Sequence, residues 1–210
     1  FQMQLFGLNG AFLTGDLFNL FVFFEILLMA SYGLLLHGGG PERTRAGLHY
    51  VIINVLGSSV FLLAAGLCYG ILGTLNFADL ALKLSAVPPE NLALARMAGL
   101  LLLGVFALKA ALLPLHLWLP AAYASACPPA AALFAIMTKV GAYAILRCQT
   151  LLFGSGAGAL AGLFEPWLLP LALATLLTGM MGALSARALA RQVAWLVVAS
   201  AGTLLAAFAL

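Results

Sequence analysis

The sequence has very little charge for its length. Of its 210 residues, 7% are charged and 65% are hydrophobic, whereas a soluble domain typically has about 25% charged and about 45–50% apolar residues. This composition excludes a soluble globular domain and a disordered chain. The nine Lys and Arg residues are spread along the whole length and form no basic face, which excludes a nucleic-acid-binding protein. The sequence is therefore that of an integral membrane protein.

Cysteine is also scarce, and the spacing of the cysteines matches no known motif. The three residues Cys68, Cys127 and Cys148 are an odd number, with no CxxC motif and no nearby Cys/His pairing. Such a set predicts neither a disulfide framework nor a metal site. We expect each cysteine to be a small buried residue in a helix, and we expect the protein to bind no metal and no cofactor.

The chain also lacks an initiator methionine and a charged leader, and it is still apolar where it stops, from Leu204 to Leu210. These features argue against a signal peptide and for a piece of a longer protein. We expect residues 1–210 to form a single transmembrane domain, truncated at both ends, with further helices on both sides. No internal repeat is visible.

Apolar runs divide the chain into membrane spans, because a spanning helix needs about 20 mostly apolar residues. The Gly38-Gly39-Gly40-Pro41 segment cannot continue a helix, and Pro128-Pro129 suits the first turn of one. The sequence thus predicts an all-α helix bundle with full spans at 16–36, 46–72, 128–150, 166–186 and 191–210, and the tail of another helix at 1–14.

Three stretches do not fit a simple span. Residues 92–126 are too long for one helix and are interrupted at Pro114 and Pro120, which predicts a broken helix. Residues 74–91 mix charged residues with prolines and predict a short interfacial helix followed by a loop. Residues 154–162 are rich in glycine and predict a flexible loop.

The basic residues of the short loops predict the orientation. Four arginines fall in turns on one side and three basic residues on the other, and we place the turns at 37–45 and 187–191 in the cytoplasm. The first group is Arg43, Arg45, Arg187 and Arg191, and the second is Lys83, Arg96 and Arg147.

Three ionisable residues lie well inside apolar spans, namely Glu25, Lys109 and Lys139. Together they would cost about 8–10 kcal/mol if nothing paired them. One glutamate cannot pair with two lysines at once, and a buried lysine loses its proton readily unless a carboxylate is near. The pattern is therefore typical of a proton carrier. The alternative is a fixed interhelical ion pair, which leaves the second lysine unexplained.

The stretch Leu108–Pro120 adds a titratable group at the predicted break. Pro114 removes the amide that would bond the carbonyl of Ala110, and Pro120 does the same for the carbonyl of His116. Unpaired carbonyls within a membrane require a wet or protein-filled surrounding. We expect His116 to relay protons there, because it titrates near neutral pH; the alternative is a core histidine bonded to a freed carbonyl.

Two weaker candidates lie near these charges. Asp16 falls on the face opposite Glu25 and at the end of its span, which favours a helix cap over a role in the proton pathway. Tyr143 shares a helical stripe with Lys139, and it could be a hydrogen-bond partner or a packing residue.

Other polar and aromatic residues carry less information. His49 could be a point where protons enter from the cytoplasm, or an ordinary interfacial histidine, and Asn54 on the same span is a weaker candidate. Trp118 and Tyr123 are expected in the aromatic belt at the membrane interface.

With these residues identified, the sequence resembles the antiporter-like membrane subunit family. This family contains the A-type and D-type subunits of Mrp multisubunit Na+/H+ antiporters and the related proton-pumping subunits of respiratory complex I. The sequences of residues 13–36 and 193–210 are most similar to those of D-type subunits. The motifs that carry the resemblance are LTGDLFNLFVFFEILLMASYGLLL (13–36), LKAALLPLHLWLPAAYASACPP (108–129) and MTKVGAYAIL (137–146).

The resemblance implies a role for each central residue. Glu25 would pair with Lys109 of the broken helix, Lys139 would carry the proton onward, and His116 would lie on the connecting segment. The turn before the last span reads ARALARQVAW, whereas relatives often have an acidic residue there. Contacts that relatives make at this turn are therefore not expected in this chain.

The implied function is a proton-translocating subunit of a monovalent cation (Na+)/H+ antiporter in the bacterial inner membrane, a transporter and not an enzyme. Its expected partners are the other membrane subunits of the complex, protons, Na+ and the lipid bilayer, with no nucleic acid. The nearest alternative is a proton-pumping subunit of complex I or of a related membrane hydrogenase. A passive scaffold and a haem- or quinone-binding redox enzyme are further alternatives, and only His116 is a reasonable haem ligand.

Overall fold

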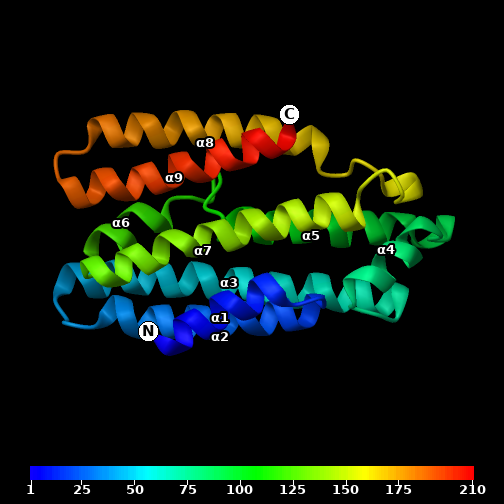
Figure 1. Cartoon of the computed structure of the whole chain (residues 1–210), viewed down its shortest axis with the longest axis horizontal. Helices are drawn as coiled ribbons and strands as arrows, with labels where there is room; N and C mark the ends of the chain where they lie inside the picture. The colour runs from blue at the N-terminus through cyan, green and yellow to red at the C-terminus, as the bar shows by residue number, and fades with distance from the viewer.

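The computed structural model describes all 210 residues, and every regular element in it is a helix. Six helices are long and apolar enough to cross a membrane, which confirms the predicted all-α transmembrane bundle (Figure 1). The α-helices are α1 (Gln2–Leu13), α2 (Leu17–Leu36), α3 (Pro41–Leu72), α4 (Phe77–Ser85), α5 (Leu92–Lys109), α6 (Trp118–Ser125), α7 (Pro128–Arg147), α8 (Glu165–Ser185) and α9 (Leu189–Ala209).

The turn between α2 and α3 is set by glycine and proline. Gly38, Gly39 and Gly40 all have positive φ angles, a conformation that residues with a side chain rarely adopt. Pro41 then occupies the first position of α3, where its missing amide costs nothing. Helix α3 therefore begins five residues before the predicted start at 46, since its polar first turns extend beyond the apolar span.

The long segment 92–126 is broken, as predicted, but only at one place. Helix α5 ends at Lys109 and α6 starts at Trp118, so residues 110–117 form the non-helical connection around Pro114. Pro120 does not interrupt anything. It is the third residue of α6, in the first turn, where backbone amides have no partner within the helix.

Figure 1 shows how the helices are layered. The hairpin of α8 and α9 lies along one side of the bundle, α5, α6 and α7 occupy the middle, and α1, α2 and α3 lie on the other side. Glycines allow the closest approach within the hairpin. A Cβ atom on Gly179 would lie 2.5 Å from the amide nitrogen of Ala199, and one on Gly202 would lie 2.5 Å from that of Leu176. Small residues at such contacts are typical of helices packed in a membrane.

The two basic turns lie at the same end of the bundle. The α2–α3 turn and the α8–α9 turn are both at the left of Figure 1, and Arg45 and Arg191 line the same surface groove. At the opposite end, Arg147 donates to the carbonyl of Thr14. The predicted division of basic residues between two sides is therefore confirmed, whereas the assignment of the first side to the cytoplasm stays a prediction.

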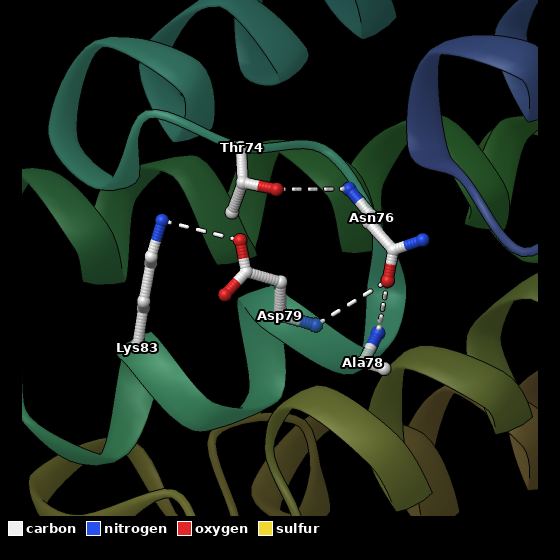
Figure 2. A network of polar contacts seen from close by, with 5 residues as sticks. All are labelled: Thr74, Asn76, Ala78, Asp79 and Lys83. Atoms are coloured by element: carbon white, nitrogen blue, oxygen red, sulfur yellow. Dashed lines mark hydrogen bonds and ion pairs between the residues drawn. The ribbon is translucent and has the colours of Figure 1, made fainter.

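Helix α4 confirms the short helix predicted within residues 74–91, whereas its position at the membrane interface stays a prediction. Its buried face consists of Phe77, Leu80 and Leu84, and its polar start is shown in Figure 2. Asn76 caps the helix by accepting hydrogen bonds from the next backbone amides, and Lys83 forms an ion pair with Asp79 at 3.1 Å.

After α7 the chain continues as one π-helical turn, Cys148–Leu152, and then enters the segment predicted as a flexible loop. This segment contains a 3₁₀ helix, Gly158–Leu160, and is closed by a 2.7 Å hydrogen bond from the amide of Gly162 to the carbonyl of Phe153.

The outer surface exposes many large apolar side chains, more than is usual for a protein in water. Large side chains such as Leu63, Met181 and Leu184 are 57%, 69% and 84% exposed. Contiguous apolar surface of this kind marks contact with a membrane or with other protein. The interior of the bundle, by contrast, contains several polar side chains.

Candidate functional site

A chain of polar groups crosses the bundle interior between α2, α3 and α5. Ser58 of α3 donates a hydrogen bond to the Oε1 atom of Glu25 on α2. The Nζ atom of Lys109, the last residue of α5, lies 3.2 Å from the Ser58 hydroxyl and donates to it. The carboxylate and the ammonium group are therefore joined through one hydroxyl, and no direct ion pair within 4.0 Å links them. The expected pairing of Glu25 with Lys109 takes this bridged form.

Asn54 completes the surroundings of the lysine. Its backbone carbonyl and its Oδ1 atom lie 3.4 and 3.5 Å from Lys109 Nζ. The Asn54 side chain is itself held by a 2.9 Å hydrogen bond from Nδ2 to the carbonyl of Tyr50. The ring of Phe24 lies 5.9 Å from Nζ. Lys109 is only 4% exposed, so these oxygens compensate part of the cost of removing its amine from water. We call Glu25, Ser58, Lys109 and Asn54 the Glu–Lys cluster.

The end of α5 places Lys109 at this point. The amide of Ala111 bonds the carbonyl of Leu108, that of Leu112 bonds the carbonyl of Ala107, and Ala111 has a φ angle of 57°. This arrangement is a Schellman motif, which stops a helix with one left-handed residue. A cation in the last turn also interacts favourably with the helix dipole. The amine is thereby fixed at a helix end inside the bundle.

Helix α7 presses against this helix end. A Cβ atom on Gly141 would lie 2.5 Å from the amide nitrogen of Ala110 and 2.7 Å from the carbonyl carbon of Lys109. Only glycine permits so close an approach without moving the backbone. Helix α7 therefore supports the segment that carries the buried lysine.

Lys139 belongs to a separate polar group. Its Nζ atom lies 2.6 Å from the hydroxyl of Ser200 on α9 and 3.2 Å from that of the adjacent Thr138. No hydrogen bond connects Lys139 with the Glu–Lys cluster. The structure thus divides the three central charges into the Glu–Lys cluster and the Lys139–Ser200 pair.

His116 lies on the connection between α5 and α6 and is buried, with 6% exposure. Its ring packs 5.6 Å from that of Trp195 on α9, and its Nδ1 atom has no hydrogen-bond partner. The predicted free carbonyl of His116 is wrong, because the amide of Leu119 donates to it at 3.0 Å. The alternative in which the imidazole bonds a freed carbonyl is not observed either.

The break is satisfied by side chains from other helices. The Thr175 hydroxyl of α8 accepts a 2.9 Å hydrogen bond from the amide of Leu113, and the indole of Trp118 donates to the carbonyl of Leu108 at 3.2 Å. Protein side chains therefore surround the break at these two points. Irregular backbone is tolerated at membrane depth where it is buried in protein in this way or lines a water-filled cavity.

Several of the weaker candidates have simple structural roles. Asp16 caps α2 by accepting from the amide of Asn19 at 2.9 Å, as expected. The hydroxyl of Tyr143 donates to the carbonyl of Phe12 at 2.9 Å and makes no hydrogen bond to Lys139. His49 is exposed at the basic end, in the groove that also contains Arg45 and Arg191.

The predicted positions of Trp118 and Tyr123 in an interfacial belt are wrong. Both are buried, with 2% and 4% exposure, and both hydrogen-bond to backbone carbonyls inside the bundle. An aromatic residue with a polar atom can satisfy a carbonyl freed by irregular backbone as well as it can face the headgroups.

Two hydroxyls that contact Lys109 and Lys139, those of Ser58 and Ser200, are absent from the residues predicted for the site. A signal for the first is present in the sequence. Tyr50, Asn54 and Ser58 are spaced by four residues and form one polar stripe on an otherwise apolar helix. Nothing comparable points to Ser200, because serine is common at membrane helix contacts.

Comparisons with known proteins place this geometry in context. Residues 14–210 match the family described as NADH:quinone oxidoreductase/Mrp antiporter, transmembrane. The D subunit of a probable K(+)/H(+) antiporter from Rhizobium meliloti (strain 1021) is 52% identical over 210 residues, which are 100% of this chain and 39% of that protein. The D subunit of a Na(+)/H(+) antiporter from Bacillus subtilis (strain 168) is 42% identical over 97% of this chain and 40% of its own length.

Solved structures give the same relationship. A chain of the Mrp complex from Dietzia sp. DQ12-45-1b superimposes with a TM-score of 0.85 at 34% identity, covering 99% of this chain and 38% of that chain. Respiratory complex I from Thermus thermophilus with bound NADH gives 0.77 at 29% identity, covering 91% and 40%. The chain thus spans about 40% of the length of the relatives it matches.

Proposed function

Because the chain belongs to the NADH:quinone oxidoreductase/Mrp antiporter family of membrane proteins, we propose that it is the proton-translocating part of the D-type subunit of a multisubunit monovalent cation/H+ antiporter. The names of the related proteins support exchange of Na+ or K+ for H+. The protein acts in the bacterial inner membrane, together with the other membrane subunits of its complex, and its task is transport rather than catalysis.

The observation that carries this proposal is the bridge from Glu25 through Ser58 to Lys109. A hydroxyl can donate one hydrogen bond while it accepts another. A proton on the lysine can therefore reach the carboxylate by two short transfers through the serine, with no movement of either helix. A bridge that served packing alone would not need two ionisable groups in an apolar interior, where each is costly.

Lys139 and His116 extend this pathway in the proposal. Both face α9, Lys139 through Ser200 and His116 through Trp195. Water molecules between these groups and the Glu–Lys cluster would complete the connection, because a water can replace a direct hydrogen bond. The unpartnered Nδ1 atom of His116 is the place where such a water would bind.

A proton pump driven by a redox partner is the second candidate. The membrane-bound sulfane sulfur reductase, an archaeal respiratory membrane complex, superimposes with a TM-score of 0.89 at 31% identity, and complex I is also similar. Both candidates use the same buried charges. The antiporter names of the more similar sequences favour the antiporter.

The proposal is tested with the full-length protein in its complete complex, in inside-out vesicles with an imposed pH gradient. The variants Glu25→Gln and Lys109→Met each remove one ionisable group of the cluster at nearly constant volume. We expect both to abolish the dissipation of the pH gradient on addition of Na+ or K+.

Two variants at the surface serve as matched controls. Glu90→Gln and Lys83→Gln remove the same types of charge from exposed positions, and we expect wild-type rates from both. A passive scaffold predicts wild-type rates from all four variants, so full activity of Glu25→Gln or Lys109→Met would refute the proposed function.

A further inference from the structure

The basic end of the bundle contains arginines without partners. Arg43 is satisfied, since it donates to the carbonyls of Ser125 and His37. Arg45, Arg187 and Arg191 form no hydrogen bond or ion pair, although Glu42 lies three residues before Arg45 on the same helix. This end also carries the excess of positive charge, because four of the six acidic residues lie at the opposite end. Those four are Asp16, Asp79, Glu90 and Glu165.

The free arginines line two neighbouring hollows. One hollow of about 720 Å³ lies between the start of α3 and the end of α6, and it contains Arg45, His49 and Arg191. A second of about 640 Å³ follows the α8–α9 turn and contains Arg187 and Arg191. The two hollows share Ala124 and Arg191, and we call them together the basic groove. Three arginines and one histidine face a single carboxylate, that of Glu42.

The wall of the basic groove continues onto the membrane-facing surface. Leu48 and Ile52 of α3 are 60% and 50% exposed and line the same hollow as Arg45. A ligand in this groove would therefore meet cationic side chains at one end and apolar side chains next to them. That combination matches an amphipathic anion at the water–membrane boundary, because basic pockets between membrane helices bind the phosphate groups of lipids.

We propose that the basic groove binds an anionic phospholipid, with its phosphate between Arg45 and Arg191 and its acyl chains along Leu48 and Ile52. The guanidinium groups can hold phosphate oxygens in paired hydrogen bonds. A zwitterionic lipid would bind more weakly, because its cationic headgroup would lie close to the same arginines. The site is distinct from the Glu–Lys cluster, and it does not depend on the proposed transport function.

The test measures lipid binding to the purified complete complex by native mass spectrometry, with phosphatidylglycerol and phosphatidylcholine added in turn. We expect the wild-type complex to bind phosphatidylglycerol more tightly. The double variant Arg45→Gln/Arg191→Gln should weaken that binding about 25-fold, at about fivefold for each arginine. Arg96→Gln, which removes an exposed arginine from the opposite end, should leave it unchanged.

Four results would overturn the proposal. The first is equal affinity of the wild-type complex for the two lipids, and the second is equal weakening by Arg96→Gln and by the double variant. The third concerns the source of the anion. If inorganic phosphate displaced phosphatidylglycerol at equal concentration, the groove would be a site for free anions. A cross-link from an Ala124→Cys variant to another subunit instead of to lipid would equally exclude the site, since a protein partner would then fill the groove.

Discussion

At the scale of single residues, each charged group inside the bundle contacts a hydroxyl group. Ser58 stands between Glu25 and Lys109, and Ser200 contacts Lys139 at 2.6 Å. A direct ion pair in an apolar interior would hold both charges tightly and resist transfer of the proton. A serine between them weakens that attraction and supplies a short path for the proton. The hydroxyls are therefore part of the proposed chemistry and not only of the packing.

The length of the Glu25 side chain can be tested directly. Glu25→Asp keeps the charge but shortens the reach toward Ser58 by one methylene group, so the carboxylate can no longer accept the hydrogen bond in its present position. We expect partial activity in the vesicle assay, between that of the wild type and that of Glu25→Gln. Complete loss in Glu25→Asp would show that charge alone, without the hydrogen bond, is insufficient; full activity would show that the bridge to Ser58 is dispensable.

At the scale of helices, the position of the buried lysine depends on how α7 packs against the end of α5. Gly141 approaches the backbone at Lys109 and Ala110 more closely than any residue with a side chain could. The broken helix is thus fixed by a contact from a neighbouring span, together with the hydrogen bond from Leu113 to Thr175 of α8.

Gly141→Ala is expected to lower stability by about 1–3 kcal/mol, the usual cost of overpacking an interior contact. Thermal unfolding of the detergent-solubilised complex measures the effect. Gly104→Ala is the matched control, because nothing lies within 4 Å of a Cβ atom there. It should leave stability unchanged or raise it slightly, since alanine favours a helix over glycine. Equal unfolding temperatures of the two variants would contradict the proposed close contact.

Helix α4 provides a pH-dependent test outside the membrane spans. Hydrogen bonds from Thr74 and Lys83 lower the pKa of the exposed Asp79 carboxyl. A lowered pKa in the folded state means that Asp79 stabilises the helix above the pKa of the unfolded chain, about 3.9. This contribution is lost as the pH falls through the folded pKa, below that value.

We therefore expect proteolysis of residues 74–91 to accelerate as the pH is lowered through this range, measured with an acid-active protease. Asp79→Asn should remove most of that pH dependence, whereas Glu90→Gln should preserve it. A pH dependence that survived Asp79→Asn would assign the effect to another group.

At the scale of the whole molecule, the bundle has two populations of polar residues, one inside it near the middle and one at its two ends, of which one end is strongly basic. The sequence predicted both populations and most of the spans, because apolar length and glycine–proline turns define a membrane helix locally. It also predicted that Glu25 and Lys109 belong together, although that pairing came from the resemblance to a family.

The remaining features could not be predicted, for a physical reason. Spans that are apolar on all sides show no preferred face, so the sequence does not say how far each helix is rotated about its axis. That rotation decides that Lys139 meets Ser200, that Tyr143 meets Phe12 and not Lys139, and that Trp118 is buried. The satisfied carbonyl of His116 likewise depends on the local turn after Pro114, which hydropathy does not describe.

The role of the bridging serine is tested by the rate at which the complete complex dissipates a pH gradient on addition of Na+ or K+, with Ser58→Ala and with Ser58→Thr. We predict that alanine, which has no hydroxyl, lowers the rate about 10- to 100-fold, the equivalent of losing a hydrogen bond to a charged group. Threonine keeps the hydroxyl and should retain most of the activity. A wild-type rate from Ser58→Ala, with the complex assembled normally, would contradict the claim that protons pass between Lys109 and Glu25 through this serine.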